Sequence, residues 1–157
     1  MTTTNIAIPE EVYSVLEFRQ HDLPGFATVN CALKGFEPKI AFSWNLSLLI
    51  MCVDLIENRL PSPAEQQVLY GFEDKLDQLI KAGQNALFLA RVTHDGQREL
   101  IWRVRDPESA NDIVQGLLRT KDYPREFDYR MEEDTQWEKA AWYLNNATAA
   151  HTTHGSI

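Results

Sequence analysis

The sequence predicts a single α+β domain, in which an antiparallel sheet carries two helices on one face. The length of 157 residues fits one domain. Segments that alternate apolar and polar residues are interspersed with two apolar stripes at helical spacing. The hydrophobic fraction of 44% and the charged fraction of 24% are ordinary for a globular protein. This composition excludes a wholly disordered chain, a collagen-like repeat and a disulfide-dense mini-protein.

Two strand-like stretches open the chain, from about residue 12 to 18 and from about residue 27 to 33. An Asp, a Pro and a Gly between them predict a connecting turn. The clearest strand follows over residues 42–53, where apolar side chains alternate with polar ones. The polar positions are Ser43, Asn45 and Ser47. Beyond them both faces are apolar, which favours a central place in the sheet.

Helix starts are marked by capping residues. Ser62 can cap a helix, Pro63 suits its first position and Glu65 completes a capping box. Apolar residues then recur at helical spacing. Asp106 and Pro107 begin a second helix by the same logic.

The remaining strands and the last helix follow from local patterns. Two β-like runs, 87–92 and 99–105, flank an Asp-Gly pair, which predicts a hairpin. Residues 126–131 alternate charged and apolar side chains and predict a last strand. Thr135 and Glu138 form a further capping box that opens a final helix.

From Phe42 to Met131 the order is strand, helix, strand, strand, helix, strand. This order predicts a ferredoxin-like βαββαβ antiparallel sheet with two helices on one face, an N-terminal β-hairpin and a C-terminal helix added. We expect residues 1–144 to form this single domain. Residues 145–157 are small and polar, and they are expected to be a disordered tail.

Several short segments resemble the bacterial domain-of-unknown-function family 695. They are Ala90 to Leu100 with Asp106-Pro107-Glu108, Leu60-Pro61-Ser62, and Glu133-Asp134-Thr135-Gln136-Trp137. The likeness covers about residues 27–144, and the chain is more distantly similar to the ribonuclease E inhibitor B family of acidic regulators. The resemblance implies a ferredoxin-like fold in a bacterial cytoplasmic protein without established catalytic activity. It also implies relatives that act as inhibitors or in toxin neutralisation.

The ends and the cysteines favour the cytoplasm. The first residues have no basic start and no apolar core, which argues against a secretory signal. The longest apolar run, Leu48 to Val53, is far shorter than the ~20 residues that span a bilayer, so no membrane association is expected. Cys31 and Cys52 lie in apolar stretches and are expected to be buried free thiols.

Catalytic and metal-binding motifs are missing from the sequence. It has no Gly-x-Ser-x-Gly elbow, no HExxH or CxxC spacing and no Gly-rich phosphate loop. We therefore expect no catalytic residue, no cofactor, no metal and no enzyme activity. Acids outnumber bases 23 to 15, for a net charge of −8, which argues against a general nucleic-acid binder.

An acid-rich stretch runs from Glu126 to Glu138 and holds one base, Arg130. Complementary charge steers encounters and sets specificity, so the stretch favours a surface for a basic protein partner. Acids also favour the start of a helix, so a merely solvated face is the alternative. The acids expected to contact a partner are Glu126, Asp128, Glu132, Glu133 and Asp134.

The sheet face away from the two helices is a second candidate site. If Leu100, Trp102 and Val104 point into the core, their neighbours along the strands point away. The residues expected to point away are Ser43, Asn45, Ser47, Ile101, Arg103, Arg105, Glu126, Asp128 and Arg130. This mixed face either binds a partner or ligand, or is solvated or covered by the N-terminal hairpin. Arg103 and Arg105 are its candidate contacts.

Three of the four tryptophans are expected in the core, and the fourth is a candidate contact residue. Trp44, Trp102 and Trp137 fall on predicted core stripes. Trp142 falls off the stripe of the last helix, so it is either an exposed interface anchor or packed against the N-terminal hairpin.

These patterns support three hypotheses. The leading one is a non-enzymatic acidic module that inhibits or neutralises a basic protein, such as a toxin or nuclease, as an immunity-type or regulator-type protein. The alternative is an enzyme or small-anion-binding protein that uses the open sheet face, with Arg103 and Arg105 holding the anion. The third is a self-associating homodimer.

Overall fold

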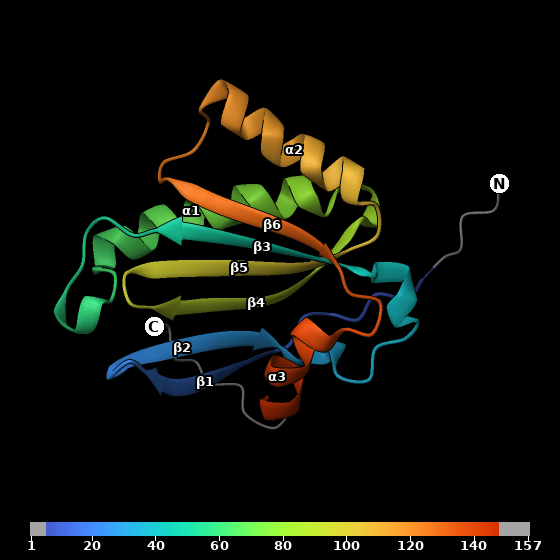
Figure 1. Ribbon diagram of the computed structural model, residues 1–157, viewed down its shortest axis with the longest axis horizontal. Helices are drawn as coiled ribbons and strands as arrows, with labels where there is room; N and C mark the ends of the chain where they lie inside the picture. Colours follow the sequence, from blue (N-terminus) through green and yellow to red (C-terminus); the bar gives the residue numbers. More distant parts are fainter. Residues whose placement is uncertain (1–5, 148–157) are drawn as a thin grey trace.

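The computed structural model describes residues 6–147. Within them, six strands form one antiparallel sheet in the order β1-β2-β4-β5-β3-β6 (Figure 1). The strands are β1 (Tyr13–Gln20), β2 (Leu23–Asn30), β3 (Trp44–Met51), β4 (Ala86–His94), β5 (Gln97–Val104) and β6 (Phe127–Glu133). The helices are α1 (Pro63–Ile80), α2 (Pro107–Thr120) and α3 (Glu138–Asn146). The predicted α+β class is confirmed.

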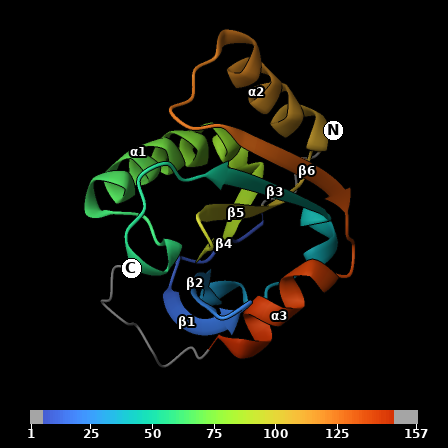
Figure 2. The same ribbon diagram turned by 60° about the vertical axis from the view of Figure 1, so that its left-hand side comes forward.

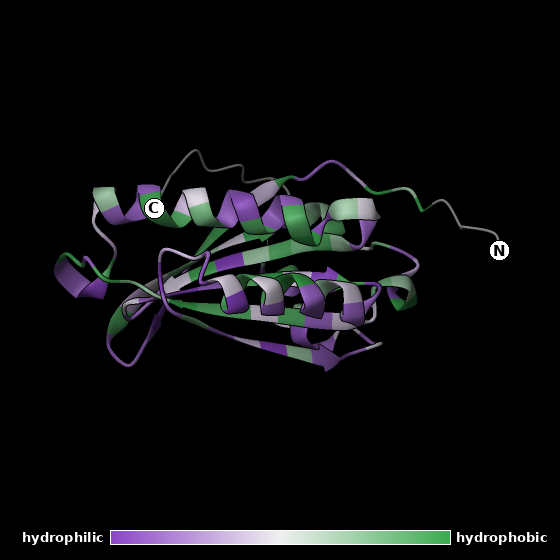
Figure 3. Cartoon of the chain, turned by 90° about the horizontal axis from the view of Figure 1, so that it is seen from above, coloured by the Kyte–Doolittle hydropathy of each residue, from purple (hydrophilic) through white to green (hydrophobic). Residues whose placement is uncertain are grey.

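Helices α1 and α2 cover one face of the sheet, and α3 lies on the other (Figure 2). The first core lies between α1, α2 and the inward residues of the strands, with Leu46, Leu48 and Trp102 fully buried. Apolar and polar bands alternate along α1 and α2, as expected where one helical face is buried (Figure 3). The burial of Leu46 and Leu48 confirms the predicted alternation of β3, and the burial of Trp102 is confirmed as well.

A second core lies under α3. It joins Ala27 and Val29 of β2, Leu89 of β4 and Leu144 of α3. A register shift between Phe88 and Ala90 places two successive residues, Leu89 and Ala90, in this core, because the extra residue breaks the alternation of β4. With a core on each side, the middle of the sheet is covered on both faces.

Several predicted boundaries move. The second predicted strand ends at Asn30, and Cys31–Leu33 form a 3₁₀ turn. The Asn30 side chain causes this turn, because its oxygen accepts hydrogen bonds from the backbone of Ala32 (3.3 Å) and Val12 (3.2 Å). Helix α3 continues to Asn146, so the predicted tail begins too early; the rest of that tail lies outside the described residues.

On the sheet face that α1 and α2 cover, two arginines of the strands donate hydrogen bonds to α1. Arg91 of β4 donates two hydrogen bonds to the Glu73 carboxylate, each 2.7 Å long. Arg98 of β5 is buried and donates to Thr93 (3.1 Å) and to Gln66 of α1 (2.6 Å). This end of the first core is thus closed by charge-assisted hydrogen bonds.

The first residues of α1 connect two distant loops. Ser62 caps the helix as predicted, because its hydroxyl accepts from the backbone N–H of Glu65 (3.1 Å). The predicted reciprocal bond is wrong, since the Glu65 carboxylate accepts instead from the Val53 N–H (2.8 Å) and from Arg125 (2.6 and 2.8 Å). The chain after β3 is thereby fixed to the segment before β6. The hydrogen bond from Arg125 is the main reason that the pKa of Glu65 falls to about 2.

This pKa predicts how stability depends on pH. A carboxylate with a depressed folded pKa stabilises the fold fully above its unfolded pKa, about 4.3, and loses that contribution as the pH falls towards 2. We expect Glu65→Gln to lower the free energy of unfolding at pH 7 by about 3 kcal/mol. Its unfolding free energy should also decline less than that of the wild type between about pH 5 and pH 2.

Urea denaturation across this pH range measures both effects, and exposed Glu57 provides the control substitution, Glu57→Gln. Parallel pH curves for the wild type and Glu65→Gln would contradict the assigned role of the Glu65–Arg125 pair.

Candidate functional site

The face that carries α3 is divided into a closed end and an open end. At the closed end, α3 and the chain that precedes it cover β5, where Arg103 is completely buried. Asn45 of β3 is buried beside it. The expectation that Arg103 and Asn45 point to an open face is therefore wrong, because the C-terminal segment covers these positions.

The guanidinium of Arg103 is held by several acceptors. It donates to the Asp134 carboxylate (2.9 Å) and to the Asp134 carbonyl (2.6 Å). It also donates to Asn45 (3.2 Å) and to the Phe42 carbonyl (3.3 Å). Its carbon centre lies 4.8 Å from the centre of the Trp137 ring, a cation–π distance. Arg103 therefore joins the sheet to the start of α3.

Asp134 is also the cap of α3. Its carboxylate accepts hydrogen bonds from the backbone N–H groups of Glu138 and Lys139, each 2.9 Å long. Burial acts to raise the pKa of Asp134, but the Lys139 N–H and Arg103 outweigh it and lower that pKa. The predicted capping box from Thr135 to Glu138 is wrong, because Asp134 provides the capping oxygen.

The other predicted contact residues remain accessible to different degrees. Glu126, Asp128, Glu132 and Glu133 are exposed on or beside β6, whereas Asp134 is buried. Glu132 forms an ion pair with Lys139 at 3.4 Å. Of the two arginines, Arg105 is partly exposed and lies over the Phe42 ring. Neither Arg103 nor Asp134 is available to a partner, because their charges are buried against each other.

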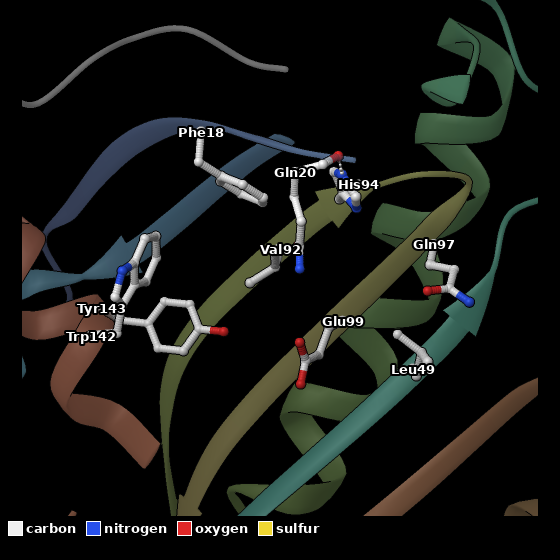
Figure 4. Close-up of a pocket in the computed structure, with 9 residues that line it drawn as sticks. All are labelled: Phe18, Gln20, Leu49, Val92, His94, Gln97, Glu99, Trp142 and Tyr143. Atoms are coloured by element: carbon white, nitrogen blue, oxygen red, sulfur yellow. Dashed lines mark hydrogen bonds between the residues drawn. The ribbon is translucent and has the colours of Figure 1, made fainter. Parts of the chain in front are cut away.

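The open end of this face contains a cavity of about 330 Å³ between α3, the β1–β2 hairpin and the sheet (Figure 4). It is lined by Phe18, Gln20, Leu49, Val92, His94, Gln97, Glu99, Trp142 and Tyr143. We call it the aromatic cavity. Its volume lies at the lower end of the roughly 300–1,000 Å³ that is typical of small-ligand sites.

A second cavity of about 540 Å³ extends the first one across the sheet towards β6. It is lined by Ser47, Leu49, Glu99, Asp128, Tyr129 and Arg130. Leu49 and Glu99 line both cavities, so the two form one groove. The β6 end of the groove carries Asp128, which pairs across the strands with Leu49.

Glu99 occupies the junction of the two cavities. One of its carboxylate oxygens accepts a hydrogen bond from the Ser47 hydroxyl at 2.5 Å. Tyr143 extends from α3 with its hydroxyl pointing towards Glu99 (Figure 4). Burial, together with the Glu99 carboxylate, raises the pKa of Tyr143 to about 12. Tyr143 therefore stays a neutral phenol near neutral pH.

Trp142 forms one wall of the aromatic cavity. Its side chain is about half exposed, and its ring packs edge-on against the Phe18 ring, with 6.1 Å between the two ring centroids. Trp142 is therefore accessible and also packs on the N-terminal hairpin, and its role as an interface anchor stays a prediction.

Sequence reasoning missed Phe18, Glu99 and Tyr143. Glu99 was detectable, because it shares the alternation of Ile101 and Arg103 along one strand. Phe18 and Tyr143 carried no comparable signal, since they reach the cavity only through the packing of the hairpin and α3 against the sheet.

In the described part of the chain, no group of three or more His, Cys, Asp or Glu side chains is arranged to hold a metal ion. Within residues 6–147, no helix is both long and apolar enough to cross a membrane. Cys31 and Cys52 are free; Cys31 is buried as expected, and Cys52 is partly exposed.

The fold and groove define an α+β domain with a covered sheet face on one side and a partly open one on the other. The chain belongs to the family of unknown function DUF695, whose model matches residues 17–145. A comparison with curated proteins finds no match. The predicted family is confirmed, and it brings no assigned activity.

The buried pair under α3 leads to a stability prediction. Asp134→Ala leaves the Arg103 guanidinium buried without its carboxylate and removes the cap of α3. We expect the free energy of unfolding to fall by about 3–5 kcal/mol, measured by urea denaturation. Glu133→Ala, at the exposed neighbouring position, should change it by less than about 0.5 kcal/mol.

The double variant Arg103→Met/Asp134→Ala tests the coupling. It should recover part of the loss, because no charge is then left unpaired in the core. A double variant that loses the sum of the two single effects would contradict the coupling.

Proposed function

We propose that this protein is a non-enzymatic binding module that inhibits or neutralises a basic partner protein. Its contact surface is the open groove together with the exposed acids of β6. The observation that carries the proposal is the continuous groove over β4, β5, β3 and β6, bordered by acidic side chains. Its charge complements a cationic surface, and the net charge of −8 extends that field beyond the contact.

The acids at the β6 border support this role because they are free to meet a partner. Glu126 and Asp128 are exposed, and no described residue forms an ion pair with either one. By contrast, Glu65, Glu73 and Asp134 are already bound to arginines of this chain. The carboxylates that stabilise the fold are thus different residues from those that are free to contact a partner.

The mechanism is occlusion. A partner whose active or binding surface is basic places that surface on the groove, and the bound domain excludes its substrate. Exposed charges contribute mainly to the association rate, while the groove contributes shape and apolar contact.

The alternative of an enzyme or anion-binding protein receives less support. It depended on Arg103 and Arg105 as anion ligands, but the charge of Arg103 is matched by Asp134 inside the core. The groove itself presents two carboxylates, Glu99 and Asp128, against one arginine, Arg130. Its character therefore favours a cationic occupant.

The proposal includes the finer expectations from the sequence. A ferredoxin-like class for β3, α1, β4, β5, α2 and β6 is supported by their strand order, β4-β5-β3-β6, with both helices on one face. We also propose a bacterial cytoplasmic setting and a distant relation to the ribonuclease E inhibitor B family, on the sequence resemblance alone.

The test begins with capture of the partner from a lysate of the source organism at low salt, followed by affinity measurements on the purified partner. Glu126→Lys/Asp128→Lys should weaken binding at least about tenfold and reduce its salt dependence. The matched control is Asp74→Lys/Asp112→Lys, which makes the same charge change at exposed positions on α1 and α2.

The two double variants discriminate between a local surface and overall charge. Equal loss in both would show that only net charge matters and would overturn the proposed surface. Capture of this chain alone, as a homodimer seen by light scattering, would replace the inhibitor proposal with self-association.

A further inference from the structure

A single carboxylate lies among the aromatic and apolar side chains of the aromatic cavity. Among the described residues that line it, Glu99 is the only Asp or Glu. Phe18, Trp142 and Tyr143 provide three rings from β1 and α3, and Leu49 and Val92 provide the apolar floor. This combination differs from the β6 border, where acids stand exposed in a row.

Glu99 retains unused hydrogen-bonding capacity. An ionised carboxylate has about four acceptor sites on its two oxygens. The Ser47 hydroxyl uses one oxygen, and no Lys or Arg among residues 6–147 pairs with Glu99. A charged acceptor is thus held in place on one side by Ser47 and left open on the other.

The walls of the cavity suit a flat cation. Trp142 and Tyr143 offer ring faces and edges that attract cations, with tryptophan the strongest of the aromatic residues. Gln97 donates its amide N–H to the Met51 sulfur (3.6 Å), so its carbonyl oxygen is a further acceptor at the rim. These acceptors and rings match a guanidinium, which is planar, stacks on aromatic faces and has five N–H donors.

We propose that the aromatic cavity binds the guanidinium of an arginine side chain of the partner protein, with Glu99 as its ion-pair acceptor. Trp142 and Tyr143 stand perpendicular to each other, so the guanidinium stacks on one ring and meets the other edge-on, and Leu49 and Val92 contact the aliphatic part of the arginine. The inference rests on the proposed function, since it names the chemical group that the groove recognises. Arginine is favoured over lysine because a compact ammonium cannot lie flat on a ring and cannot donate two parallel hydrogen bonds to one carboxylate.

The test uses the full-length protein and a small probe, so it needs no partner. Nα-acetyl-arginine N-methylamide is titrated into ¹⁵N-labelled protein, with the corresponding citrulline compound as the uncharged control of the same shape. We expect the arginine compound to shift the Trp142 indole signal and the Val92 and Glu99 amide signals with a dissociation constant in the millimolar range. Citrulline should bind at least about tenfold more weakly.

Two variants locate the charge and the rings. Glu99→Gln keeps the shape and should weaken arginine binding at least about tenfold, whereas Asp74→Asn, at an exposed position of α1 outside the groove, should change it less than about twofold. Trp142→Ala independently tests the contribution of the rings. The thermal melting curve of each variant is compared with that of the wild type to check that the variant is folded.

The outcomes separate this inference from the proposed function. Equal binding of arginine and citrulline, or unchanged binding in Glu99→Gln, would overturn the guanidinium site. If the probe titration overturns the guanidinium site but Glu126→Lys/Asp128→Lys still weakens binding of the partner, the proposed function stands. If the arginine compound binds but Glu99→Gln leaves the affinity for the partner protein unchanged, the assignment to a partner arginine is overturned.

Discussion

The buried ion pair between Arg103 and Asp134 determines how the C-terminal helix lies on the sheet. Arg103 comes from β5 in the middle of the sheet, and Asp134 both neutralises it and caps α3. Replacing a buried pair by apolar residues is often neutral for stability, so its main effect here is positional. The guanidinium donates to acceptors on three segments at once, and its bonds to Asp134 hold the start of α3 against the sheet.

The position of α3 then creates the groove. The helix covers the end of the sheet near Arg103, while Trp142 and Tyr143 line the adjoining aromatic cavity. The β1–β2 hairpin provides the opposite wall through Phe18, which meets Trp142 edge-on. A pair that is itself inaccessible therefore fixes the shape of the surface that we propose for binding.

Charge is used differently on the two faces. On the helix-covered face, Arg91, Arg98 and Arg125 all find acceptors on α1, and Glu65 joins two loops. On the open face, Glu99 and Asp128 have no cation from residues 6–147 paired with them. Because unpaired acids contribute little to folding, their concentration around the groove supports a role in recognition.

The sequence by itself determined the α+β class, the family, most strand and helix positions and the capping by Ser62, because alternation, helical spacing and turn residues are local signals. It also identified β6 as a strand with exposed acids. Only the tertiary structure decided that Arg103 and Asn45 are buried, that Asp134 rather than Thr135 caps α3, and that Phe18, Glu99 and Tyr143 share a cavity. Alternation tells which side of a strand a residue faces, but what covers that side depends on contacts between residues far apart in the chain.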